Sequence, residues 1–156
     1  MAGLTPGYYS LDDVTCTIGP TAGAPPVNLS GYGSDGGIEY EIQEDIHSIN
    51  VGADGLAVFS ESNNGVVVVT ITLKSQSVAA KRLATLMQAQ KSFPGLPPCP
   101  YNMVDPHTGD AVSDANAVGK ALPTPNKTSE ASERSFEFYL PNARDDFALG
   151  PAVTPV

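Results

Sequence analysis

The chain is poor in several residue types that carry recognisable chemistry. Its 156 residues include no tryptophan, two cysteines and two histidines. Eight Lys and Arg stand against 17 Asp and Glu, which gives a formal net charge of −9. Because phosphate binding needs clustered basic residues, this balance argues against a protein that binds nucleic acid. The two thiols, Cys16 and Cys99, belong to no metal-binding or redox motif, so we expect a buried small residue and a loop residue rather than a disulfide.

Long apolar runs are also missing. No strictly apolar run is longer than the four residues Val66–Val69, far too few to cross a bilayer, so we expect no membrane partner. The first ten residues lack the basic and apolar regions of a secretory signal. Synthesis and assembly in the cytoplasm is therefore the expectation.

No catalytic constellation emerges from the residues that are present. Glu39 and Glu41 share one face of a strand and could form a catalytic carboxylate pair, but such alternation is far more typical of a solvated sheet face. His47 and His107 each stand near an aspartate, yet two histidines without paired spacing are usually surface or turn residues. The chain has no nucleophile elbow and no phosphate-binding loop. We expect no enzyme, no metal and no cofactor.

The composition is that of a folded protein with short elements. Apolar residues make up 41% of the chain, and fourteen prolines and fifteen glycines cluster between the periodic segments. We expect a single domain over residues 1–141 and an extended C-terminal arm over 142–156. The fold is predicted to be mainly β with one α-helix. The pattern predicts a helix over 78–90, capped by Ser75 or Ser77, and strands at 13–19, 27–30, 38–50, 56–61, 66–73, 101–104 and 135–140. Residues 111–122 are ambiguous between a strand and an irregular segment.

Two of these strands have informative faces. Ile38, Tyr40 and Ile42 alternate with Glu39 and Glu41, so we expect an apolar face toward the core and an acidic face away from it. This strand is expected to run on to the hairpin turn at 52–55. The strand at 66–73 is apolar on both faces in its first half, which suggests cover from the core on one side and from another subunit on the other.

The charges are sorted along the chain. Residues 1–73 hold nine acids and no base, whereas residues 74–91 hold four bases and no acid. Such separation favours a chain that docks onto copies of itself, since acidic and basic faces fix register and partner choice. The bases expected at an inter-subunit contact are Lys74, Lys81 and Arg82. The opposing acids expected are Asp12, Asp13, Glu44, Asp45 and Asp54, with Val66 and Val68 as apolar contacts.

The order of these motifs resembles the tail-tube proteins of contractile-tailed bacteriophages. The resemblance rests on the strand Asp13–Ile18, the block Ser48–Gly55, the turn Ser62–Gly65 and the strand Val66–Leu73. The following helix, the turn at 105–109 and the closing strand that ends at Leu140 fall in the same order and extend it over most of the chain.

This resemblance implies a small β-sandwich or barrel, made of two packed antiparallel sheets with one flanking helix. It implies hexameric rings that stack into a hollow tube, with each subunit lending strands to a closed inner β-barrel. On this reading Glu39, Glu41 and Gln43 line the lumen, where a negative surface repels the phosphates of passing DNA. The implied partners are further copies of the chain, the tail sheath protein, the tape-measure protein and DNA in the lumen, and the baseplate and tail-terminator proteins. The implied location is the virion tail.

Two alternative functions stay open. The tube of a bacterial contractile secretion or injection system would have the same architecture, with a secreted effector as its cargo. A ligand-binding β-sandwich, such as a carbohydrate module, is the other alternative. Such a module should show surface aromatics for sugar stacking, but the chain has no tryptophan and its six tyrosines are scattered.

Overall fold

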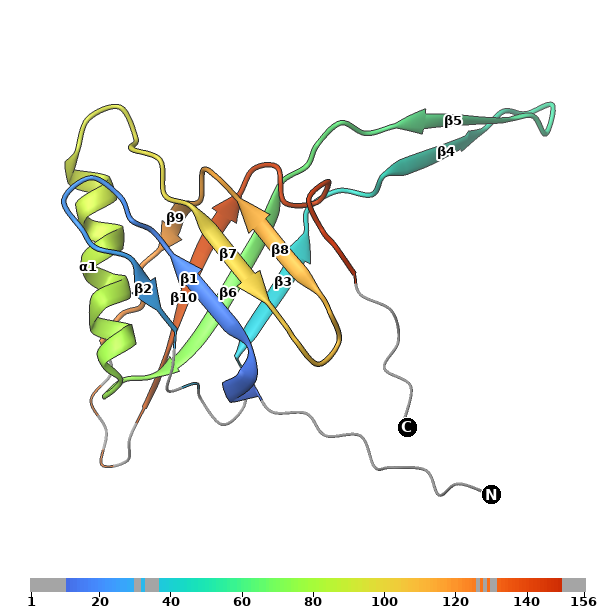
Figure 1. The fold of residues 1–156 in the computed structure, drawn as a ribbon. Helices are drawn as coiled ribbons and strands as arrows, with labels where there is room; N and C mark the ends of the chain where they lie inside the picture. Colours follow the sequence, from blue (N-terminus) through green and yellow to red (C-terminus); the bar gives the residue numbers. More distant parts are fainter. Residues whose placement is uncertain are drawn as a thin grey trace, which may run out of the picture.

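The computed structural model describes residues 11–29, 32, 37–125, 127, 129 and 132–149, and these residues form a mainly β structure with one α-helix (Figure 1). Two four-stranded antiparallel sheets make up the body. The first sheet has the order β2 (Val27–Asn28), β1 (Thr15–Ile18), β7 (Tyr101–Val104), β8 (Ala111–Asp114). The second has the order β3 (Ile38–Ile42), β6 (Val67–Lys74), β10 (Glu133–Leu140), β9 (Val118–Ala121). The remaining elements are a short 3₁₀ turn at Leu11–Asp13, the helix α1 (Val78–Ser92) and a separate hairpin of β4 (His47–Val51) and β5 (Ala57–Glu61).

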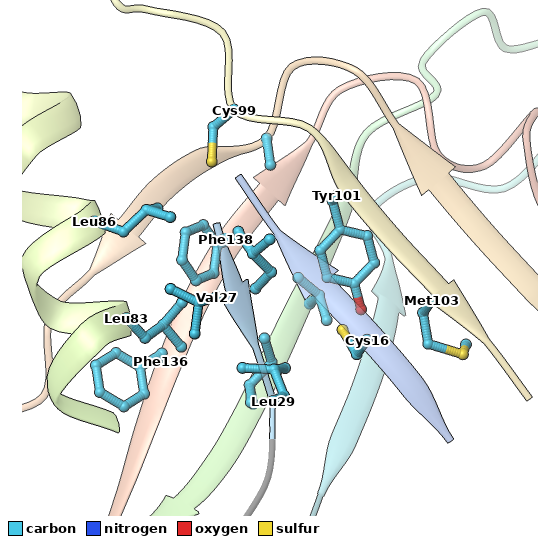
Figure 2. Packing of buried hydrophobic residues seen from close by; sticks show 14 of the residues in the cluster. Cys16, Val27, Leu29, Leu83, Leu86, Cys99, Tyr101, Met103, Phe136 and Phe138 are labelled. Carbon is cyan, nitrogen blue, oxygen red and sulfur yellow. The ribbon is translucent and has the colours of Figure 1, made fainter. Parts of the chain in front are cut away.

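The hydrophobic core lies between the two large sheets and is completed by α1. Phe136 and Phe138 of β10 and Tyr101 of β7 are fully buried in it (Figure 2). Leu83 and Leu86 project into the same core from α1 and are also fully buried. The inward side chains of the sheets follow the period of two that a half-buried strand requires.

The expected helix is confirmed. It begins at Val78, and the Ser77 hydroxyl oxygen caps it by accepting a hydrogen bond from the backbone N–H of Ala79 at 3.2 Å. It ends two residues later than expected, at Ser92, whose hydroxyl donates to the carbonyl oxygen of Gln88 at 2.8 Å.

The expectation that one strand continues from residue 38 to residue 50 is wrong. β3 ends at Ile42, which stands opposite Val67, the first residue of β6. One further backbone hydrogen bond joins Gln43 to Val66. The chain then bends and forms β4, which pairs with β5 alone. Ile42 was expected to face the core but is 50% exposed, because it lies at the open end of the sheet.

The turns that join the strands agree partly with expectation. Gly55 adopts a positive φ of 82°, as the hairpin turn at 52–55 requires. The ambiguous segment 111–122 resolves into the two strands β8 and β9, which lie in different sheets. Asp114 is buried at their junction, where its carboxylate accepts hydrogen bonds from the backbone N–H groups of Asn116 and Asn142, each at 2.8 Å.

The residues just after β10 lie against the body. Ala143 is fully buried, and Ala148 exchanges backbone hydrogen bonds of 2.7 and 2.9 Å with Ala111. The ring of Phe147 packs edge-on against Tyr40, with 5.8 Å between the ring centres. The residues beyond 149, which complete the predicted C-terminal arm, lie outside the described part of the chain.

Neither large sheet closes into a barrel within the described residues of one chain. Each has two edge strands, and those of the second sheet are β3 and β9. The closed inner barrel implied by the family resemblance would need several copies of the chain, so it stays a prediction.

Candidate assembly surfaces

The second sheet turns one face to the core and leaves its other face open. The register places Glu39 and Glu41 of β3 beside Thr70 and Val68 of β6 on this open face. Glu39 and Glu41 are exposed, as the alternation of the sequence predicts. Gln43 lies just past the end of β3 and is also exposed, with its backbone N–H donating to Val66 at 3.3 Å.

The open face carries a small negative charge. Its ionisable side chains are Glu39, Glu41, Glu133, Glu137, Lys74 and Lys120, a formal charge of −2. Lys120 lies 3.8 Å from the Glu137 carboxylate and 5.6 Å from the ring centre of Tyr139. Hydroxyl groups occupy the middle of the face, where Thr72 and Ser135 share a hydrogen bond of 3.2 Å.

Val66 and Val68 were expected to contact another subunit. Val66 is half-buried, but Val68 is only 3% exposed because it lies between Glu41 and Tyr139 in the register. Val68 therefore has little surface of its own left to bury against a partner. Its assignment to an inter-subunit contact stays a prediction.

The hairpin of β4 and β5 projects from the body and is exposed along its whole length (Figure 1). On one of its faces Ile49 stands opposite Phe59, and Val51 stands opposite Ala57. Ile49, Val51 and Phe59 are 60%, 57% and 67% exposed. An isolated two-stranded hairpin is at best marginally stable in water, and its apolar face would normally be covered. The hairpin is therefore the most conspicuous unpartnered surface of the described chain.

Arg144 fixes the base of this hairpin. Its guanidinium donates to the carbonyl oxygen of Ser62 at 2.9 Å and to that of Glu44 at 3.5 Å. The Arg144 side chain is only 6% exposed, and its backbone N–H donates to Gly65 at 3.2 Å. No local pattern in the sequence indicates this role, because Arg144 lies 82 residues from Ser62 and 100 residues from Glu44 along the chain.

The tip of the hairpin is shaped by its own turn. The Asp54 carboxylate accepts a hydrogen bond from the backbone N–H of Leu56 at 3.1 Å, and the N–H of Gly52 donates to the carbonyl oxygen of Leu56 at 2.9 Å. Asp54 was predicted to contact another subunit. The structure places it in the turn at the tip of the hairpin, exposed and next to the exposed Leu56.

The bases expected at a contact are distributed over two regions. Lys81 and Arg82 are exposed on α1, and neither forms an ion pair with any residue that the structure describes. Lys74 ends β6 opposite Glu133 and lies outside the helix. The structure thus places Lys81 and Arg82 on one helix and Lys74 at the end of a strand.

Among the expected opposing acids, Asp13 already has a partner in its own chain. Its carboxylate lies 2.8 Å from the His107 imidazole, which belongs to the turn after β7. Glu44 and Asp45 are exposed at the base of the hairpin. The side chain of Asp12 lies outside what the structure describes.

A cavity of about 360 Å³ opens between the C-terminal end of α1 and the edge strand β9. Met87, Leu96 and Leu122 contribute apolar walls, and Lys91 lies at its border. Gln90 builds this region from within, since its amide nitrogen donates to Ala117 at 2.8 Å and its amide oxygen accepts from the N–H of Gly119 at 3.0 Å.

The loop at the mouth of this cavity is strained. Leu96 has a positive φ of 49°, a conformation that costs a non-glycine residue of the order of 1–3 kcal/mol. The Gln90 amide also donates to the neighbouring Pro97 carbonyl at 3.2 Å, which helps to hold the loop in place. As a result Leu96 stands 56% exposed at the cavity mouth. No pattern in the sequence indicates this cavity, because the residues of its walls form no motif.

The two thiols are free and buried, and Cys99 lies in a loop as expected. Burial raises the pKa of the Cys16 thiol to about 12, although a hydrogen bond with Tyr101 lowers it somewhat. Burial also raises the pKa of Cys99 to about 11. The hydroxyls of Tyr101 and Tyr40 share a hydrogen bond, and burial raises the pKa of both phenols (Figure 2 shows Tyr101 above Cys16). Cys16, Tyr40 and Tyr101 thus form a polar cluster between the sheets.

Within the described residues, no three His, Cys, Asp or Glu side chains gather in a way that could hold a metal ion. None of the described helical segments has both the length and the apolarity needed to cross a membrane.

Comparison with known proteins identifies the family. The model of the bacteriophage PhiTE tail tube protein family matches residues 7–96, which is more than half of the chain. The matched region contains β1 to β6, the projecting hairpin and α1. A search of curated proteins found no match. On the strength of the family match, the chain belongs to the bacteriophage PhiTE tail tube protein family and is a structural component of a phage tail.

Proposed function

We propose that this chain is the tail-tube subunit of a contractile phage tail, assembled into stacked hexameric rings that enclose a conduit for DNA ejection. The observation that carries the proposal is the apolar hairpin of β4 and β5, which has no cover in the single chain. Complete burial of a side chain such as Ile49 or Phe59 is worth about 1.5–3 kcal/mol. A second copy of the chain would supply that cover.

The edges of the second sheet support the same proposal. β3 and β9 each leave one side of their backbone unpaired in that sheet. Exposed edges promote uncontrolled pairing, and closing a sheet on itself removes them. In our proposal β3 of one subunit lies next to β9 of its neighbour, and the sheets of all subunits join into the inner barrel of the ring.

The open face of the joined sheets would then line the lumen. Glu39 and Glu41 lie on this face, with Gln43 at its border. With a formal charge of −2 per subunit, the face would repel phosphates weakly along the whole wall. This surface suits a conduit through which DNA and a tape-measure protein pass without adhering. The opposite side of the subunit would meet the sheath, and the baseplate and terminator proteins would contact the ends of the tube.

Electron microscopy of the purified full-length chain tests the proposal, because tubes or stacked rings are expected. The Ile49→Ser, Phe59→Ser double variant removes one apolar cross-strand pair of the hairpin and should abolish tubes. The Ser48→Ala, Ser60→Ala variant changes the adjacent pair on the other face and should leave them intact.

All four side chains are exposed, so both variants should unfold at the same temperature as the parent. Tubes that form equally well from the Ile49→Ser, Phe59→Ser variant would show that the hairpin does not drive assembly. A parent chain that remains monomeric as its concentration is raised would count against the proposed function itself.

A further inference from the structure

We propose that the tip of the hairpin of one copy docks into the cavity between α1 and β9 of a second copy. This inference rests on the tail-tube function proposed above and names the surface that receives the hairpin. Leu56 would enter the apolar cavity, while Asp54 would lie beside Lys91.

The cavity has the character of a receiving site. Its volume of about 360 Å³ lies near the lower end of the range of about 300–1,000 Å³ found for small binding pockets. Its open rim includes Leu96 and Leu122, which are 56% and 43% exposed, together with the lysines Lys91 and Lys120. Gln90 makes three hydrogen bonds that tie α1 to the loop at Pro97, to Ala117 and to β9, so the walls are held in position before any partner arrives.

The hairpin tip has the matching shape and chemistry. Leu56 is 68% exposed, and a turn with three internal hydrogen bonds holds it next to Asp54. With five residues in each strand at about 3.3 Å per residue, the paired strands carry this tip roughly 16 Å outward. A narrow apolar projection with one carboxylate is the kind of group that an apolar cavity bordered by an ammonium group accepts.

The surrounding charges are complementary. The hairpin segment 43–64 contains the acids Glu44, Asp45, Asp54 and Glu61 and no Lys or Arg. The helix α1 contains Lys81, Arg82 and Lys91 and no acid. Such a pairing of opposite charges steers the approach of two copies and suppresses the approach of two like surfaces.

The positions of the two surfaces allow the contact to repeat. Figure 1 shows the hairpin leaving the body on the side opposite α1. The hairpin continues from the edge strand β3, whereas the cavity is bordered by β9, the other edge strand of the same sheet. When two copies stand side by side in the same orientation, the β3 edge of the first faces the β9 edge of the second. The hairpin of the first then points toward the cavity of the second.

Disulfide trapping in the assembled full-length protein tests this contact. The variant that carries Leu56→Cys and Leu122→Cys should give a ladder of covalent oligomers on mild oxidation of tubes. The matched control carries Leu56→Cys and Val104→Cys, because Val104 of β7 is 41% exposed, almost the same as Leu122. The native thiols are buried and should not take part, and circular dichroism should confirm that both variants are folded.

A second measurement addresses the charge. Asp54→Asn keeps an oxygen that can accept the hydrogen bond from Leu56 but removes the negative charge. Lys91→Gln removes the opposing charge. When added to the Leu56→Cys, Leu122→Cys variant, each substitution should lower the yield of covalent oligomers at low salt. Without either substitution, 0.5 M salt should lower that yield to a similar level.

The outcomes separate this inference from the proposed function. A ladder with Leu122→Cys but not with Val104→Cys supports docking in the cavity. Tubes of the Leu56→Cys, Leu122→Cys variant that give no ladder overturn the inference. A ladder from a Leu149→Cys, Leu122→Cys variant in place of the Leu56→Cys pair also overturns it, because a different segment would then occupy the cavity. Both results leave the tail-tube function standing. Failure of the parent chain to assemble overturns both.

Discussion

The guanidinium of Arg144 donates a hydrogen bond of 2.9 Å to the carbonyl oxygen of Ser62, the residue that follows the hairpin. The same group reaches the carbonyl oxygen of Glu44, which precedes the hairpin, at 3.5 Å. One side chain therefore links both ends of the hairpin to the segment after the last strand. This link sets the direction in which an otherwise unsupported pair of strands leaves the body.

Replacing Arg144 should release the hairpin. Arg144→Lys keeps the charge but loses the planar fork that can reach two carbonyl groups at once. We expect a loss of about 1.5–3 kcal/mol in the free energy of unfolding, the usual worth of a hydrogen bond to a charged group. Hydrogen exchange over residues 47–61 should become faster. Arg134→Lys is the control, because Arg134 lies at the far end of β10 from the hairpin. Unchanged exchange in the Arg144→Lys variant would mean that other contacts hold the base.

The charge of the open sheet face should control whether the tube adheres to DNA. Glu39→Lys with Glu41→Lys changes the formal charge of the face from −2 to +2 per subunit. Both side chains are exposed, so the free energy of unfolding should change by no more than about 0.5 kcal/mol. DNA should be retained in virions or tubes of this variant at low salt and released at high salt. The neutral Glu39→Gln, Glu41→Gln variant should retain more DNA than the parent and less than the lysine variant. Normal DNA ejection from virions that carry the lysines would contradict a lumenal position of this face.

Lys81 and Arg82 should matter for contacts between copies and not for the fold. Both are exposed and form no ion pair with the described residues, and an exposed pair formed on assembly gives only about 0–1 kcal/mol. In the proposed rings, repetition of the pair around each ring would multiply this small energy. Lys81→Glu with Arg82→Glu should shorten the tubes seen by electron microscopy and leave the unfolding temperature unchanged. Gln88→Glu, which adds a charge to α1 but removes no base, is the control. If tubes of the reversed variant keep their length at every salt concentration, these bases form a solvated helix face.

The buried thiol of Cys16 should make the fold sensitive to alkali. Its pKa is raised from 9.0 to about 12, so the folded state keeps a proton that the unfolded state loses first. The stabilisation is complete below pH 9.0, and the free energy of unfolding should fall as pH rises from 9.0 toward about 12. Denaturant titrations between pH 8 and pH 11 should show this fall, and Cys16→Ala should show a shallower one. A parallel slope in the two proteins would assign the pH dependence to the buried tyrosines instead.

The elements that the sequence predicts well are those fixed by local signals. The β-branched run of β6 and the serine cap of α1 carry their own information, and both appear where expected. The break between β3 and β4 could not be predicted in this way. Period-two alternation continues through residues 47–51, and β3 ends because its partner β6 begins at Val67. A strand's end that is set by its neighbour leaves no mark in its own sequence.

The exposed surfaces were predictable only in part. The alternation of the sequence predicts Glu39 and Glu41 on the exposed face of their strand, and the charge pattern predicts exposed bases on α1. The roles of Gln90 and Arg144 depend on backbone groups that lie from 7 to 100 residues away in the chain. Such partners become visible only when the chain is folded. The same holds for the exposure of the hairpin, because an apolar strand in a sequence is normally assigned to the core.

The position of the hairpin and the cavity on opposite sides of the subunit has a consequence for how a ring is completed. In an open row of copies, the first and last members leave one hairpin and one cavity unused. In the proposed ring, the copy that closes the circle would make two such contacts at once, whereas every earlier addition would make one. Loss of a member from a finished ring would likewise break two contacts. Ring formation should therefore be cooperative, with free subunits and complete rings abundant and partial arcs rare.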